Sequence, residues 1–142
     1  MKISIAFLAL FALIWTPVWA EEVPDLVGNW TGETLAIRIG SPPHLPGITS
    51  ENITYSNATP ALIIEEQNGR RFSGKLLHIN VNPPFAEMIF GVISFDNETV
   101  YMVDEDGYHD GRLISPTEME LIYRKTSPEN MIIGITRYTK TT

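Results

Sequence analysis

Residues 26–32 read LVGNWTG, and this stretch decides how the rest of the chain is interpreted. Trp30 lies two residues after Gly28 and two residues before Gly32. A glycine inside a strand permits a bend or a bulge, and one tryptophan side chain buries a large apolar area. We therefore predict that the first strand begins here, bends at its glycines and places Trp30 as a plug at one end of the fold.

The residues that follow show the pattern of an all-β chain. Short runs rich in Val, Ile, Phe, Tyr and Thr alternate with turn signals, and no long stretch repeats apolar residues at helical spacing. Asn68-Gly69 predicts a tight hairpin turn, because both residue types tolerate positive φ. The expected strands cover residues 26–39, 61–67, 70–80, 86–95, 99–104, 108–114, 117–125 and 131–138.

Successive short hairpins build a meander in which each strand pairs with the next. Eight strands suit a closed barrel, and closure removes the exposed edges that would otherwise aggregate. We therefore predict an all-β, eight-stranded up-and-down antiparallel barrel. A cation from the last strand would complete the plug by stacking on Trp30, and Arg137 is placed for that role.

Residues 40–60 predict a long loop without regular structure. They contain four prolines, including Pro42, Pro43 and Pro46, which restrict its motion. Loops of this length in compact domains are usually functional or disordered, and we expect this one to lie over the open end of the barrel as a lid. It also carries two N-glycosylation sequons, at Asn52 and Asn57.

The N-terminus is typical of a secretory signal peptide. Lys2 precedes an apolar run, and Val18-Trp19-Ala20 suits the small-residue rule for cleavage. The alternative is an uncleaved anchor, but the apolar run is shorter than the roughly 20 residues that a spanning helix needs. We expect residues 1–20 to be removed and residues 21–142 to form one exported domain, either secreted or at the cell exterior or periplasm, with no remaining membrane span.

Charge and cysteine content exclude several classes of function. The formal net charge is −7, without a basic stripe, so neither nucleic acid nor an anionic membrane surface is an expected partner. The chain has no cysteine, which rules out disulfides, thiol catalysis and thiolate metal sites.

Gly28-Asn29-Trp30 in the first strand, the eight-strand meander and Arg137 in the last strand together resemble the calycin superfamily, which includes lipocalins and avidins. The resemblance implies a small ligand-binding barrel. Avidins hold biotin with several tryptophans, whereas only Trp30 lies beyond residue 20, so biotin is not expected. Lipocalins usually carry a helix before the last strand, and residues 124–130 leave no room for one.

No motif indicates catalysis, a metal or a cofactor, and we expect none of the three. Asp104, Asp106 and Asp110 have oxygen ligands that suit calcium, but a hairpin turn at Asp106-Gly107 explains them better. The three histidines, His44, His78 and His109, are far apart in sequence. Glu65-Glu66 would point to opposite faces of a strand and cannot share a substrate.

The predicted barrel interior is apolar with a few phenol hydroxyls. Its expected ligand-binding residues are Phe72, Phe90, Tyr101, Met119 and Tyr123, with Leu76, Val92, Val103, Leu121, Ile133 and Ile135 also facing inward. We predict non-catalytic binding of a small apolar or amphipathic ligand. The first alternative is a filled barrel that acts as a structural or protein-interaction domain. The second is an enzyme, which a buried carboxylate facing Tyr101 or Tyr123 would favour.

Overall fold

The computed structural model describes residues 22–40 and 51–141. Within them the chain forms nine strands and no helix: β1 (Gly28–Gly40), β2 (Thr54–Ala58), β3 (Ala61–Asn68), β4 (Arg71–His78), β5 (Phe85–Ile93), β6 (Thr99–Val103), β7 (Tyr108–Ser115), β8 (Glu118–Thr126) and β9 (Asn130–Thr141). No helix in this part is long and apolar enough to cross a membrane. The predicted signal peptide, residues 1–20, lies outside the described residues, so its cleavage stays a prediction.

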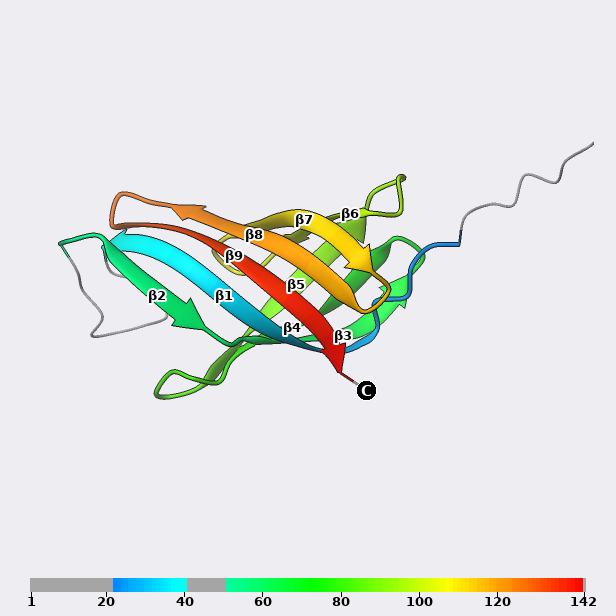
Figure 1. Ribbon diagram of the computed structural model, residues 1–142, viewed down its shortest axis with the longest axis horizontal. Coiled ribbons are helices and arrows are strands. Elements are labelled where there is room, and N and C mark those ends of the chain that lie inside the picture. The colour runs from blue at the N-terminus through cyan, green and yellow to red at the C-terminus, as the bar shows by residue number, and fades with distance from the viewer. Residues whose placement is uncertain (1–21, 41–50, 142) are drawn as a thin grey trace, which may run out of the picture.

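The strands close into a barrel of eight antiparallel strands. From β3 to β9 each strand pairs with the next, and β9 pairs with β1 from Asn29 to Gly40. The remaining edge of β1 pairs with β3 over residues 28–31, which completes the circle. The prediction of an all-β, up-and-down antiparallel barrel is confirmed (Figure 1).

β2 is an extra strand on the same edge of β1 as β3. It pairs with β1 over residues 34–38, and Pro60 separates it from β3. Figure 1 shows β2 beside β1 at the left-hand side, the side on which the turn between β8 and β9 also lies. The prediction that residues 40–60 lack regular structure is therefore wrong for Thr54–Ala58. Residues 41–50, with Pro42, Pro43, His44 and Pro46, lie outside the described residues.

The hairpin between β3 and β4 occurs where the sequence predicts it, shifted by one residue. Asn68 pairs with Arg71, so Gly69 and Arg70 form the two-residue turn. Gly69 has a φ of 60°, and a positive φ at the first central position is the pattern of a type II′ turn. A bulge between Ile64 and Glu66 precedes this turn in β3, and both Glu65 and Glu66 are exposed.

Trp30 plugs one end of the barrel, as predicted, and its side chain is 1% exposed. Its indole Nε1 donates a hydrogen bond of 3.0 Å to the carbonyl oxygen of Leu26. The segment before β1 therefore crosses this closed end, with Leu26 fully buried. The core fills the adjoining half of the barrel with residues that include Leu62, Ile64, Phe72, Ile89, Met102, Met119 and Leu121.

The cation over Trp30 is Lys140, so the prediction that Arg137 completes the plug is wrong. Lys140 Nζ lies 5.5 Å from the centre of a Trp30 ring, and Gly28 makes room for its stem. Arg137 is 62% exposed and pairs with Glu118 and Glu120 on the outer face. Side chains alternate along a strand, and in β9 the even-numbered positions face inward.

Candidate functional site

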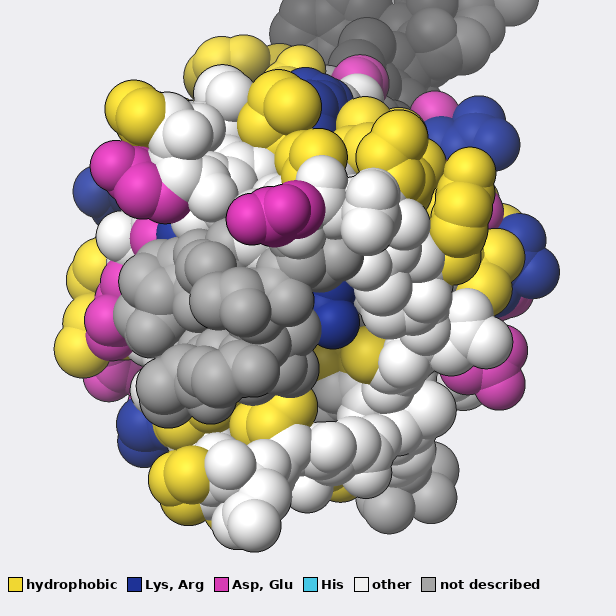
Figure 2. All heavy atoms as spheres, turned by 90° about the vertical axis from the view of Figure 1, so that its left-hand side faces the viewer, with side chains coloured by type: hydrophobic (Ala, Val, Ile, Leu, Met, Phe, Trp, Pro, Cys, Tyr) yellow, Lys and Arg dark blue, Asp and Glu magenta, His cyan; other side chains and the backbone are white. Residues whose placement is uncertain are grey.

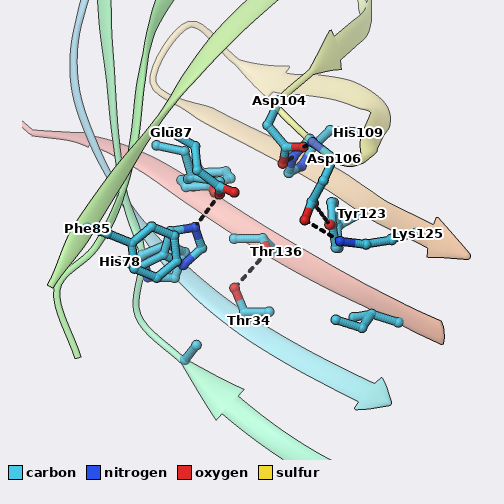
Figure 3. Close-up of a pocket in the computed structure, with 15 residues that line it drawn as sticks. Thr34, His78, Phe85, Glu87, Asp104, Asp106, His109, Tyr123, Lys125 and Thr136 are labelled. Carbon is cyan, nitrogen blue, oxygen red and sulfur yellow. Dashed lines mark hydrogen bonds and ion pairs between the residues drawn. The ribbon is translucent and has the colours of Figure 1, made fainter. Parts of the chain in front are cut away.

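The half of the barrel opposite Trp30 is hollow. Its cavity measures about 160 Å³ and is lined by residues from every strand of the barrel except β3 and β6, together with β2 and the turn between β6 and β7. The apolar part of its wall is formed by Leu76, Phe85, Ile132 and Tyr138. Figure 3 shows two groups of polar side chains that approach this space from opposite walls.

One wall carries a histidine–carboxylate pair from β4 and β5. His78 Nε2 and Glu87 Oε2 are 2.7 Å apart, and the Glu87 side chain is only 7% exposed. The His78 ring stacks on Phe85, with centroids 4.3 Å apart. Because the stack and the hydrogen bond act on the same ring, they hold the imidazole of His78 in one orientation at the cavity wall.

The opposite wall carries a second histidine–carboxylate pair, at the β6–β7 turn. His109 Nε2 lies 2.8 Å from Asp104 Oδ2, and both side chains are buried. Asp104 Oδ1 accepts hydrogen bonds from the backbone N–H groups of Asp106 and Gly107. Burial raises the pKa of Asp104, but His109 and the two N–H groups outweigh burial, and the net result is a lowered pKa.

Asp106 brings two further side chains to this wall. Tyr123 Oη donates a hydrogen bond of 2.8 Å to Asp106 Oδ1, and Lys125 forms an ion pair with Asp106 Oδ2. Burial, the hydrogen bond to Asp106 and the charges of Asp104, Asp106 and Glu87 raise the pKa of Tyr123 far above its usual range. Tyr123 therefore remains a neutral hydrogen-bond donor.

Thr34 of β1 and Thr136 of β9 join the polar groups at the cavity. Their hydroxyl oxygens are 2.7 Å apart. Tyr138 lies one inward position further along β9, and Gly32 lies beside it, since a Cβ on Gly32 would be 2.7 Å from the Tyr138 ring. The missing side chain of Gly32 therefore leaves room for the buried ring of Tyr138.

Beyond the cavity a wider hollow of about 490 Å³ leads outward and shares Asp106, Lys125 and Ile132 with the cavity. Arg38 and Ile39 of β1 also line it. Seen from the end where the tips of β1 and β2 lie, the surface is indented, with hydrophobic and basic side chains inside the indentation (Figure 2). A ligand that enters the cavity therefore has further side chains to contact outside it.

Of the five predicted ligand-binding residues, Tyr123 is the one that lines the cavity. Phe72 and Met119 face inward but lie in the filled core. Phe90 and Tyr101 are 57% and 49% exposed on the outer face, so the prediction that they line the interior is wrong. The inward placement of Val92, Val103, Ile133 and Ile135 is wrong as well, whereas that of Leu76 and Leu121 is confirmed.

These errors arise from apolar strands with no visible alternation. In β5 both faces carry apolar residues, and the inward set is Glu87, Ile89, Gly91 and Ile93. An acidic residue at an inward position contradicts the expectation that acids face solvent. The register is reliable in β4, where Phe72 and Leu76 face inward as predicted and His78 lies on the same face.

Most of the polar groups at the cavity were not predicted as site residues: His78, Glu87, Asp104, Asp106, His109 and Lys125. The sequence interpretation treated the acids at 104–110 as a soluble hairpin turn. That turn is confirmed by the Asp104 hydrogen bonds, and Asp110 pairs with Arg124 outside the barrel. Within the described part of the chain, no group of three His, Asp or Glu residues is arranged to hold a metal ion.

No protein-family model matches this chain. No curated protein matches it. Among solved structures, the S-type phycobiliprotein lyase CPES from Guillardia theta is similar, with 9% identity over 82% of this chain and 89% of that chain and a TM-score of 0.34. The eight-stranded barrel itself is consistent with a calycin-like fold, and a likeness of this size gives no information about function.

Proposed function

We propose that this chain is an exported, non-catalytic binding protein whose barrel mouth takes one small amphipathic ligand. The observation that supports the proposal is the division of the barrel into a filled half under Trp30 and a walled cavity of about 160 Å³. A closed eight-stranded barrel holds either side chains or one small ligand. Apolar walls with a few oriented polar groups are typical of ligand sites.

The size of the cavity limits the part of the ligand that it accepts. An apolar cavity of about 150 Å³ admits a benzene ring, so a single ring or a short branched chain is the expected guest. The polar end of the ligand would contact the histidine–carboxylate pairs or the two threonines. Any longer portion would extend into the outer hollow.

Two neighbouring substitutions on β1 test the proposal. Thr34 lines the cavity, whereas Leu35 is 64% exposed on the outer face. With 2-phenylethanol as the probe, saturation-transfer NMR should detect binding to the wild type and to Leu35→Phe. Thr34→Phe should abolish the signal, because the new ring occupies the cavity. Unchanged transfer with Thr34→Phe, or no transfer with the wild type from this probe and from its amine and carboxylate analogues, would contradict the proposal.

Export is the second component of the proposal. Expression in a secreting host should yield a chain whose intact mass corresponds to cleavage after Ala20, with Glu21 as the first residue. Recovery of the full-length chain in the membrane fraction would refute cleavage but leave the ligand-binding part of the proposal intact.

A protein-interaction role is the alternative, supported by an apolar outer face. Phe90 pairs with Val103, which pairs with Tyr108, and these three side chains are 57%, 38% and 66% exposed. Contiguous exposed apolar side chains often mark an interface. Sedimentation equilibrium of the wild type and of Phe90→Ser would reveal self-association through this face as a concentration-dependent mass that the substitution removes.

The enzyme alternative depends on the contact between Tyr123 and Asp106. A partly buried carboxylate beside a phenol would suit acid–base chemistry. Asp106 is already paired with Lys125, and the raised pKa of Tyr123 opposes its action as a base. We therefore place non-catalytic binding first.

A further inference from the structure

More negatively charged than positively charged side chains line the cavity. Glu87 approaches from β5, and Asp104 and Asp106 approach from the β6–β7 turn on the opposite wall (Figure 3). Lys125 of β8 is the one lysine or arginine among the residues that line this cavity. When the imidazoles of His78 and His109 are neutral, three carboxylates therefore face one ammonium group.

Burial makes this imbalance effective. The side chains of Glu87, Asp104 and Lys125 are 7%, 2% and 8% exposed. Charges in such a site are screened much less than charges at the surface, so Glu87 and Asp104 act on the cavity at a lower effective dielectric constant than Asp106, whose side chain is 19% exposed. Two further basic side chains, Arg38 and Arg124, line the outer hollow and not the cavity.

The hydrogen bonds also occupy donors of the residues that line the cavity. Tyr123 uses its hydroxyl hydrogen on Asp106. A neutral imidazole that donates from Nε2 to a carboxylate presents Nδ1 as an acceptor. His78 and His109 each make that Nε2 contact, with Glu87 and Asp104, so neither donates from Nδ1 in this state.

The effect on Tyr123 supports a negative potential in the cavity. Part of the rise in its pKa comes from the charges of Asp104, Asp106 and Glu87, which lie on both walls. Asp104 also raises the pKa of Tyr138, after the larger effect of burial. Both phenols therefore lie within range of the carboxylates that line the cavity.

We infer that the ligand of this cavity is a small organic cation, with an amine carried by a ring-sized apolar body. This inference rests on the proposed function and specifies its ligand. The apolar walls would receive the ring, and the amine would donate to the carboxylate–imidazole pairs. An anion of the same shape would be repelled by the carboxylates.

Three probes of equal size separate the charge of the ligand from its shape. They are 2-phenylethylamine, 2-phenylethanol and phenylacetate, measured by calorimetry at about pH 8 and at low salt, where charges are screened least. The amine should bind at least about tenfold tighter than the alcohol, and phenylacetate should bind weakest. If the alcohol binds as tightly as the amine, the cation inference fails and the proposed function stands. If none of the three binds, both fail.

Two substitutions of opposite sign make the test independent of folding defects. Glu87→Gln removes one negative charge, so amine affinity should fall about tenfold while alcohol affinity stays within about twofold. Lys125→Met removes the positive charge, so amine affinity should rise. Glu33→Gln, an exposed site on the outer face of β1, is the matched control and should change neither. Amine affinities that move in the same direction in Glu87→Gln and Lys125→Met would overturn the inference.

Discussion

At the scale of single residues, the plug consists of the buried indole of Trp30 and the ammonium group of Lys140 from β9. Lys140 lies over Trp30 and donates a hydrogen bond of 3.1 Å to the carbonyl oxygen of Asp25. Lys140→Met should lower the free energy of unfolding by about 0.5–1 kcal/mol, since the cation–π contact is lost. Arg137→Met, at an exposed ion pair, should cost less than about 0.5 kcal/mol. Urea denaturation measures both, and a larger loss at Arg137 would contradict the assignment of Lys140.

Asp104 links a residue of the cavity wall to the pH dependence of stability. Its pKa is lowered in the folded state, so its contribution is complete above its unfolded pKa of about 3.9 and disappears as pH falls through the folded pKa. Asp104→Asn should cost about 1–3 kcal/mol near neutral pH. The difference from the wild type should shrink as acid protonates Asp104.

Urea denaturation at several pH values between neutrality and about pH 3 would measure that difference. Asp110→Asn is the control, because Asp110 pairs with Arg124 on the outer face, where both side chains are partly exposed. A difference between Asp104→Asn and the wild type that stays constant down to low pH would show that the carboxylate charge has no part in it.

The same residues show what single positions reveal in a sequence. Trp30 was predictable because a lone tryptophan between two glycines has one efficient place in a barrel. The contacts at the cavity were not predictable from the sequence. His78 and Glu87 lie nine residues apart on two paired strands, and the second histidine–carboxylate pair, on the opposite wall, lies further along the chain. Sequence spacing does not reveal proximity across a closed barrel.

At the scale of elements, β2 is the strand with the weakest support. It pairs with β1 alone among the described strands, whereas β9 is paired along both edges, with β1 and β8. Local opening depends on the contacts that an element must break. The amides of Thr54–Ala58 should therefore exchange with deuterium at least about tenfold faster than those of residues 132–136 in β9. Equal protection of the two strands would mean that β2 has a further partner.

The same weakness explains why β2 was missing from the prediction. Its sequence, TYSNA, has one aromatic residue among small and polar ones, and three prolines and two glycines occur within residues 40–53 before it. Its strand conformation follows from pairing with β1, a tertiary contact that sequence propensity does not encode. β4 and β8 were predictable because alternation of apolar and polar residues fixes their register.

At the scale of the whole molecule, the two ends of the barrel differ in structure: one is closed and filled, and the other is open and holds the cavity. The closed end is sealed by Trp30 and by the segment that precedes β1, while the open end keeps the buried charges apart from the core. A hollow half with buried charges costs stability. The closed end, with Trp30 and the segment before β1, must therefore stabilise the fold enough to offset that cost. The quantity to measure is therefore the contribution of this closed end to the free energy of unfolding.

Shortening the chain from its N-terminus tests how much the segment before β1 stabilises the closed end. Leu26 is fully buried, its N–H donates to Gln67 Oε1 at 2.8 Å, and Gln67 Nε2 donates to the carbonyl oxygen of Pro24 at 2.8 Å. A chain that starts at residue 21, as predicted for the cleaved protein, keeps these contacts. One that starts at residue 28 should lose about 3–5 kcal/mol, from burial of one leucine and the two hydrogen bonds.

Point substitutions separate the seal from chain length. Leu26→Ala should cost about 2–4 kcal/mol, because the cavity that it leaves is enclosed by the plug. Val27→Ala is the matched neighbour, since Val27 is 39% exposed, and it should cost less than about 1 kcal/mol. Thermal and urea unfolding of the four chains should therefore rank the start at residue 28 as the least stable, followed by Leu26→Ala. If the chain that starts at residue 28 unfolded at the same urea concentration as the chain that starts at residue 21, the N-terminal segment would not seal the barrel, and the hollow half would have to be stabilised by the paired strands alone.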